Sequence, residues 1–190
     1  MEKKISLVNY QNETNGARKE YFRQIILEDL KNAPKGLKTH FKTANNDPDI
    51  VMRQMYTSYL AEKAVLDHLK TQMPDQDWNF VDPDTAGYYQ LNHKATNLPD
   101  LKNKAGTTVE VKATKIYGSG KVYFTTPMKT IEGFWEKKLH APDYLVIYDS
   151  GLAICLTKDE VINNVIEVLP AKYDQLTFVI EVDKNKAKFI

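Results

Sequence analysis

Apolar residues in the first third of the chain recur at intervals of three and four positions, the spacing of a helix with one buried face. This pattern predicts a helix over residues 17–32, which the Pro and Gly of residues 33–36 then end. Asp47 and Pro48 supply an N-cap and a first-turn proline for a longer helix that runs to about residue 72. We therefore expect two helices before any sheet begins.

Beyond residue 72 the pattern changes to short apolar or alternating runs, which are typical of strands. We expect strands at residues 88–91 and 121–125, and two more at 143–148 and 151–156, joined by a turn at Asp149-Ser150. The order of helices followed by interrupted strands predicts an α/β domain with a mixed sheet flanked by helices.

The last part of the chain carries two helix starts and a pair of strands. Thr126-Pro127 is expected to start a helix that contains Phe134 and Trp135, which we interpret as core residues. The sequence Thr157-x-x-Glu160 is a capping box for a short helix. Residues 176–182 and 186–190 are expected to form a terminal hairpin.

One segment of this strand-rich region carries candidate chemistry. Asp100, preceded by Pro99, is separated from the run Val109 to Thr114 by polar residues and Gly106, which suit a hairpin turn. Such a hairpin would place Asp100 and Glu110 side by side. Because side chains alternate along a strand, Glu110, Lys112 and Thr114 would share one face and three apolar residues the other.

Two carboxylates and an ammonium at this spacing suit a hard divalent cation such as Mg²⁺, which prefers carboxylates and water. Such an ion lowers the pKa of a bound water and polarises a phosphate, and Lys112 would orient the water or stabilise developing charge. An acidic residue two positions before a lysine recurs elsewhere in the chain, so the short motif alone is weak. The alternative is a surface hairpin with an ordinary charge pair.

With Pro99, Asp100, Glu110 and Lys112 in this arrangement, the chain resembles the PD-(D/E)xK superfamily of restriction-endonuclease-like nucleases over roughly residues 50 to 156. The resemblance implies a restriction-endonuclease-like fold and a Mg²⁺ site, with Mn²⁺ as a substitute. It also implies metal ligation by Asp100, Glu110 and the backbone carbonyl of Val111. Families of this kind often add a glutamate from the preceding helix, here Glu62, which would support the metal, through water if not directly.

Glu62 also stands out without the resemblance. At about 100° per residue, apolar residues surround it on the helix surface, namely Met55, Tyr59, Val65, Leu66 and Leu69. A carboxylate on such a stripe is costly unless it has a partner such as a metal, a metal-bound water or a lysine. The alternatives are a helix rotation that lets Glu62 reach solvent, or a structural pair with a lysine.

Composition sets the broad class. A chain of 190 residues with 42% hydrophobic and 27% charged content is typical of one globular domain. We divide it into an N-terminal helical element (1–45), which would dimerise or contact DNA, and a catalytic core (46–190). No signal peptide or apolar run of membrane-spanning length is seen, so a cytoplasmic protein is expected. Cys155, the one cysteine, lies in an apolar run and is interpreted as buried.

The net charge of +1 does not by itself indicate a nucleic-acid-binding protein, so local positive charge is needed. Candidate nucleic-acid contacts are Thr114, Lys115, Lys102, Lys104, Lys121, Lys38 and Lys42. We expect an endodeoxyribonuclease of the restriction type that acts on DNA as a homodimer, because one site per chain cuts one strand at a time. The alternatives are a monomeric nickase, a structure-selective nuclease, an RNA substrate, a noncatalytic nucleic-acid-binding module, or an unrelated α/β domain.

Overall fold

The computed structural model describes residues 15–32, 48–82, 86, 98–172, 174–186 and 188–189. The chain divides into two compact units. The first combines Met1–Leu60 with Asp82–Thr96, and the second combines Ala61–Val81 with Asn97–Ile190. Each unit is described by itself.

The first unit contains the helix α1 (Asn15–Asn32) and the start of α3 (Pro48–Gln72), so both predicted N-terminal helices are confirmed. Asp47, the expected N-cap of α3, lies outside the described residues. The buried guanidinium of Arg18 lies 4.5 Å from the centre of the Tyr59 ring and donates to the Ala86 carbonyl at 2.7 Å. An arginine is tolerated here because its flat, weakly hydrated cation stacks on aromatic faces.

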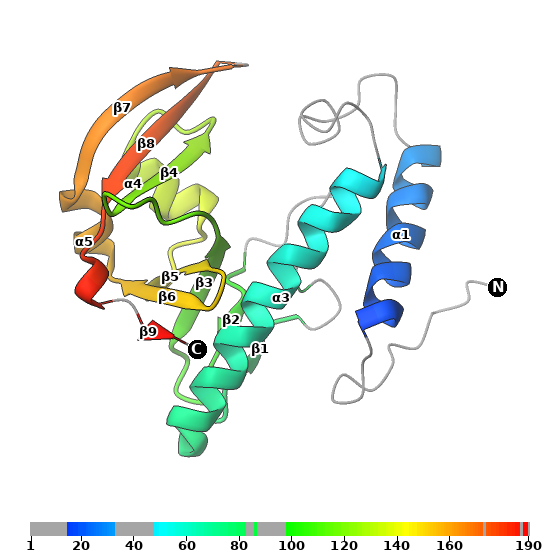
Figure 1. Cartoon of the computed structure of the whole chain (residues 1–190). Coiled ribbons are helices and arrows are strands. Elements are labelled where there is room, and N and C mark those ends of the chain that lie inside the picture. The colour runs from blue at the N-terminus through cyan, green and yellow to red at the C-terminus, as the bar shows by residue number, and fades with distance from the viewer. Residues whose placement is uncertain are drawn as a thin grey trace. The chain divides into compact units, whose positions relative to one another are not determined.

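The second unit is built on a mixed sheet, shown in Figure 1. Of the strands that the structure describes in this sheet, β3 and β5 run parallel and the other neighbours are antiparallel. Among the described residues its strand order is β1 (Asn79–Phe80), β2 (Leu101–Lys102), β3 (Thr108–Ala113), β5 (Tyr144–Asp149), β6 (Leu152–Leu156) and β9 (Lys188–Phe189). The parallel β3–β5 pair brings together residues that are 35 positions apart in the sequence, such as Val109 and Tyr144.

A second, antiparallel sheet has the order β4 (Lys121–Thr126), β8 (Gln175–Glu181) and β7 (Val165–Ala171). The strand at 121–125 is thus confirmed, but the terminal hairpin is wrong. β8 pairs with β4 and β7, whereas β9 pairs with β6 in the other sheet. The β4–β8 and β6–β9 pairs join strands that are distant in sequence, and no local pattern identifies such partners.

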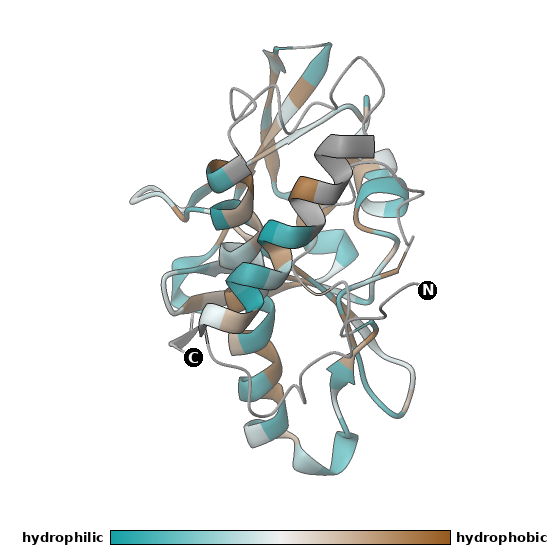
Figure 2. Ribbon diagram, turned by 90° about the vertical axis from the view of Figure 1, so that its right-hand side faces the viewer, coloured by the Kyte–Doolittle hydropathy of each residue, from teal (hydrophilic) through white to brown (hydrophobic). Residues whose placement is uncertain are grey.

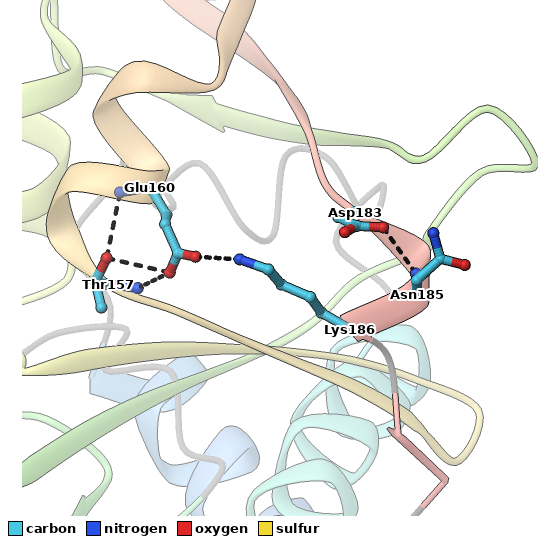
Figure 3. A network of polar contacts seen from close by, with 5 residues as sticks. All are labelled: Thr157, Glu160, Asp183, Asn185 and Lys186. Atoms are coloured by element: carbon cyan, nitrogen blue, oxygen red, sulfur yellow. Dashed lines mark hydrogen bonds and ion pairs between the residues drawn. The ribbon is translucent and has the colours of Figure 1, made fainter.

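Short helices connect the strands: η2 (Pro74–Gln76), α4 (Ile131–Gly133), the π-helix η3 (Phe134–Lys138), α5 (Lys158–Asn163) and η4 (Lys184–Lys186). The helix expected from Thr126-Pro127 begins later, because Thr126 ends β4 and the Thr130 hydroxyl caps α4 by accepting from the Gly133 N–H at 3.0 Å. The capping box of Thr157 and Glu160 is confirmed, and Figure 3 shows it joined to Lys186.

The core of this unit lies where both sheets meet α4, η3 and α5. Phe134 and Trp135 are buried in it, as predicted, together with the inward side chains of β4, β5, β6 and β8. The ring centres of Phe124 and Phe134 lie 5.2 Å apart. Helices of the chain carry both hydrophilic and hydrophobic residues, as expected where one side is buried (Figure 2).

The hairpin of β5 and β6 is confirmed, but its turn is formed by Ser150 and Gly151 rather than by Asp149-Ser150, because Asp149 still pairs with Leu152. Ser150 and Gly151 have positive φ values of 52° and 94°. Positive φ at both central residues is typical of the turn that best fits the twist of two paired strands. Cys155 is exposed, so its expected burial is wrong. Ile154 and Leu156 are the buried residues of β6, and strict alternation turns Cys155 to the opposite face.

The mixed α/β class is therefore confirmed, with two sheets and flanking helices. The predicted strand at 88–91 lies outside the described residues, and β1 and β7 were not predicted. Within the described ranges, no helix combines the length and apolar character that crossing a membrane requires.

Candidate functional site

The hairpin that carries the candidate chemistry forms as predicted. β2 pairs with β3 with Leu101 opposite Val109. The turn is closed by hydrogen bonds from the Asn103 N–H to the Thr107 carbonyl (3.0 Å) and from the Thr107 N–H to the Asn103 side-chain oxygen (2.8 Å). Gly106 has φ +95°, a conformation that L side chains rarely adopt. Turn chemistry thus fixes the register of the two strands.

This register places Asp100 directly before β2 and opposite Glu110 of β3. The Val111 N–H donates to Oδ2 of Asp100 at 2.7 Å, and the Asp100 carbonyl accepts from the Val81 N–H at 3.0 Å. Asp100 is therefore held from both sides by backbone groups. The two carboxylates lie close enough for the Glu110 charge to raise the pKa of Asp100.

Glu110 is buried although it is a charged residue on a strand. Its residue exposure is 3%, and Val109 and Val111 on the opposite face are also buried, because β3 lies between β2 and β5. Glu110 Oε1 accepts a hydrogen bond from the ammonium of Lys112, whose side chain is 32% exposed. These burial values contradict the alternative of an ordinary surface charge pair.

The second oxygen of the Glu110 carboxylate, Oε2, is buried and has no hydrogen-bond partner among the residues that the structure describes. A buried carboxylate oxygen in this state carries a desolvation cost that a hydrogen bond or a cation normally offsets. Among the described residues, Glu110 Oε2 is therefore a buried acceptor that a cation would satisfy.

The titration of the carboxylate pair reflects the same burial. Burial raises the pKa of Asp100 from 3.8 to about 7, the Glu110 charge adds to the rise, and Lys112 opposes it. Asp100 is only partly buried as a whole residue, so the rise in its pKa comes from the burial of its carboxyl group. Burial also raises the pKa of Glu110, and the Lys112 and Lys138 charges only partly oppose this. Two ionised carboxylates are unfavourable here without further positive charge.

Two basic residues that the sequence analysis did not assign to the site, Lys138 and His140, act electrostatically on this pair. Lys138 is exposed as a whole residue, but its ammonium group is largely buried. This burial lowers the pKa of Lys138 most, and the Lys112 charge lowers it further. The pKa of the His140 imidazole is lowered by burial and then by Lys112 and Lys138, while Asp100 raises it. The site therefore brings two lysines and a histidine, whose pKa values burial and mutual repulsion lower in the case of Lys138 and His140, to the two carboxylates.

The turn that carries these residues is built tightly. Lys138 ends the π-helix η3, and His140 and Ala141 then both have positive φ values, 63° and 47°. The Ala141 N–H donates to the Trp135 carbonyl at 3.0 Å. Asp143 Oδ2 then accepts from the Thr108 N–H at 2.7 Å, which fastens the turn to the start of β3. Strained turns and π-helical segments are often found at functional sites.

Glu62 is buried at 5% exposure, on the apolar side of α3 between buried Tyr59 and Val65. The alternative in which Glu62 reaches solvent is therefore wrong. In the described part of the chain, no group of three or more His, Cys, Asp or Glu side chains is arranged to hold a metal. Metal ligation would rest on Asp100 and Glu110, and a supporting role of Glu62 stays a prediction.

The predicted nucleic-acid contacts are spread over several surfaces. Lys102 and Lys104 are exposed on the hairpin, and Lys115 is exposed just beyond β3. Thr114 and Lys121 are half-buried, and the Thr114 N–H donates to the Tyr148 carbonyl at 3.0 Å. Lys38 and Lys42 lie outside the described residues. Their contact with a substrate remains a prediction.

Comparison of the chain with protein-family models, with curated proteins and with solved structures returns no match. What the site can do is therefore argued from its own residues.

Proposed function

We propose that the chain is a Mg²⁺-dependent phosphodiesterase, an endodeoxyribonuclease that resembles the PD-(D/E)xK superfamily, with Mn²⁺ able to replace Mg²⁺. The observation that carries this proposal is the buried oxygen Oε2 of Glu110, which has no hydrogen-bond partner among the described residues and lies beside a second carboxylate. Carboxylates with unmet charge are the ligands that a hard divalent cation prefers. The donor set fits such an ion.

Asp100, Glu110 and the carbonyl of Val111 would hold the metal. When bound, Mg²⁺ supplies a water of lowered pKa and polarises the phosphate to be cut. The Val111 N–H orients Asp100 through the 2.7 Å hydrogen bond to Oδ2, which leaves Oδ1 as the donor for a cation. The Lys112 ammonium occupies Oε1 of Glu110 and leaves Oε2 as the second donor.

The positive side chains have a separate task. A phosphodiester gains negative charge in the transition state of hydrolysis, and fixed cations stabilise that charge. Lys112 acts on both carboxylates and would orient an attacking water, Lys138 would add positive charge near Glu110, and the His140 imidazole would exchange a proton near Asp100. A noncatalytic module would gain nothing from burying carboxylates in this way, since their burial costs stability.

The activity test uses purified protein with plasmid, linear duplex and branched DNA, in Mg²⁺, Mn²⁺ or EDTA. Asp100→Ala and Lys112→Ala should abolish metal-dependent cutting. The matched controls Asp75→Ala and Lys172→Ala remove exposed side chains of the same types and should cut like the wild type. Folded protein that cuts no substrate in any metal would contradict the proposal and favour the binding module.

The products define the kind of nuclease. A restriction enzyme produces discrete fragments from duplex DNA, and a homodimer would supply the second site for the opposite strand. A structure-selective nuclease prefers branched or unpaired DNA over linear duplex. One surface near the site bears on this choice.

A further inference from the structure

Two tyrosines and a lysine are exposed near the end of β3: Lys115 and Tyr117 follow this strand, and Tyr123 lies on β4. Tyr117 and Tyr123 are 44% and 38% exposed, and their ring centres are 5.1 Å apart with an angle of 76° between the ring planes. The Lys115 ammonium lies 4.9 Å from the centre of the Tyr117 ring. We call these three residues the tyrosine platform. It presents aromatic faces and a positive charge to solvent.

The loop that carries the tyrosine platform is held firmly. The Tyr117 N–H donates to the Lys121 carbonyl at 3.0 Å, and the Tyr117 carbonyl accepts from the Gly120 N–H at 2.8 Å. The Ile116 N–H donates to Oδ2 of Asp149 at 2.8 Å. The Gly118 carbonyl accepts from the Lys184 ammonium. Tyr117 is thus fixed in an exposed position by bonds to three separate segments.

Gly120 shows how closely this loop fits its surroundings. It has φ +80°, and a Cβ atom there would lie 2.7 Å from the Val182 carbonyl oxygen. The Val182 N–H in turn donates to the Gly120 carbonyl at 2.8 Å. Any other residue would have to displace backbone, so glycine is required here. A rigid loop orders little on binding, which keeps the entropy cost of binding low.

The chemistry of the platform fits the bases of an unpaired nucleic-acid strand. Exposed aromatic rings next to a cation favour stacking on bases and contact with phosphate, and every base has a face that can stack. The nearby acidic side chains are engaged within the protein: Asp149 accepts from the Ile116 N–H, and Asp183 Oδ1 accepts from the Asn185 N–H. Lys115 and Lys184 supply the positive charge that would attract a phosphate next to the rings.

The platform is also at a suitable distance from the site. Tyr117 is five positions after Lys112 in the sequence, and the Cα atoms of an extended chain of that length lie at most about 18 Å apart. That span corresponds to no more than about five stacked nucleotides. A single strand whose phosphate lies at the carboxylates would therefore reach the platform within a few nucleotides.

We propose that Tyr117, Tyr123 and Lys115 bind unpaired nucleotides of single-stranded DNA next to the bond that is cut. This inference rests on the proposed function, because it identifies the substrate class of the same site. It favours a structure-selective nuclease over the restriction type, since bases in an intact duplex are stacked on each other and cannot stack on Tyr117.

Binding without turnover tests the proposal. Fluorescence anisotropy in EDTA would measure the affinity of the full chain for a labelled single strand of about 12 nucleotides and for the matching duplex. The wild type should bind the single strand more tightly. Tyr117→Ala should weaken single-strand binding by about 5- to 150-fold, the range expected for loss of one base stack. Tyr144→Ala, which removes a tyrosine of 38% exposure on β5, is the matched control and should change affinity less than about twofold.

Tyr117→Phe separates stacking from loss of structure. Phenylalanine keeps the ring, so this variant should bind like the wild type, and circular dichroism should show that all variants are folded. Equal affinity of the wild type and Tyr117→Ala for the single strand, or no binding of single strands, would overturn the platform. If single-strand binding depends on Tyr117 but the protein cuts no DNA in any metal, the tyrosine platform is supported and the nuclease proposal is contradicted. If the protein cuts DNA but its single-strand binding does not depend on Tyr117, the nuclease proposal is supported and the platform is contradicted.

Discussion

Two glutamate–lysine pairs in this unit have opposite surroundings. Glu160 of α5 accepts from Lys186 and from the backbone and side chain of Thr157, and these bonds lower its pKa to about 2 (Figure 3). Within the part of the chain that the structure describes, Glu110 of β3 accepts a hydrogen bond from Lys112 alone, is buried, and has a raised pKa. The same two residue types therefore stabilise the protein at one place and cost stability at the other.

This contrast shows how a ligand site can be recognised from the surroundings of its own residues. A satisfied pair such as Glu160 and Lys186 is explained by the fold, because its bonds join the capping box of α5 to the segment before β9. The Glu110 and Asp100 pair is not explained by the fold, because burial of two adjacent carboxylates is unfavourable in the protein alone. Such local cost is typical of residues that are kept for a ligand.

The largest expected effect is on catalysis. Glu110→Gln removes a metal ligand and its charge while keeping the shape of the side chain, so the rate of DNA cutting in Mg²⁺ should fall by about 100-fold or more. Glu160→Gln, the same change in the satisfied pair, should leave the cutting rate within about twofold. Equal rates for wild type and Glu110→Gln in a plasmid assay would contradict the role of Glu110.

The second effect is on stability at neutral and alkaline pH. The folded-state pKa of Asp100 is raised to about 7 from 3.8, so ionisation is more costly in the folded protein than in the unfolded chain. The metal-free protein should therefore lose stability as pH rises from about 4 through about 7. Asp100→Asn should remove this loss and stabilise the metal-free protein at pH 8 by about 1 to 2 kcal/mol. Thermal unfolding of both proteins in EDTA at several pH values measures the difference, and a wild type that is no less stable than the variant at pH 8 would count against it.

The third effect is on the satisfied pair and has the opposite sign. Glu160 has a folded-state pKa of about 2, below its ordinary 4.5, so its contribution is present above about pH 4.5 and is lost as pH falls through about 2. Glu160→Gln should lower the melting temperature at pH 7 by a few degrees, and the gap should narrow as pH falls from 4.5 towards 2. The neighbouring exposed change Asp159→Asn is a suitable control. A difference in melting temperature between wild type and Glu160→Gln that grows at low pH would show that the hydrogen bonds of Glu160 are not the cause.

The smallest effect concerns the capping box alone. Thr157→Ala removes the hydroxyl that accepts from the Glu160 N–H, and should destabilise the protein by about 1 kcal/mol. Thr157→Ser keeps that hydroxyl and should restore most of the loss. Urea unfolding measures both, and a serine variant as unstable as the alanine variant would show that the lost methyl group, rather than the cap, is responsible.

Local chemistry made the hairpin predictable. Asn103 and Gly106 fix the turn, and the period of two along β3 puts Glu110 and Lys112 on one face. The burial of Glu62 followed from the apolar residues around it on α3. The capping box at Thr157 was visible because it depends on residues only three positions apart. All of these features depend on residues that are close to one another in the sequence.

Lys138 and His140 could not be placed from the sequence, because they reach the site through the parallel pairing of β3 with β5. The predicted pairing of β8 with β9 was wrong for a similar reason, because β8 pairs with β4 and β9 pairs with β6, both distant in sequence. The predicted burial of Cys155 was wrong because a short apolar run does not reveal which face of the strand is buried. The sequence feature that could have drawn attention to His140 is the pair of lysines, Lys137 and Lys138, at the end of the preceding helix.

The most direct test of the central claim is a calorimetric titration of Mn²⁺ into the full chain at pH 7, repeated in two buffers with different ionisation enthalpies. Asp100 is partly protonated near its pKa of about 7, so metal binding should release protons, and the measured heat should differ between the buffers. We predict one such site per chain in the wild type and its loss in Glu110→Gln. A folded wild-type protein that binds no metal, or binds it equally well after Glu110→Gln, would contradict the account.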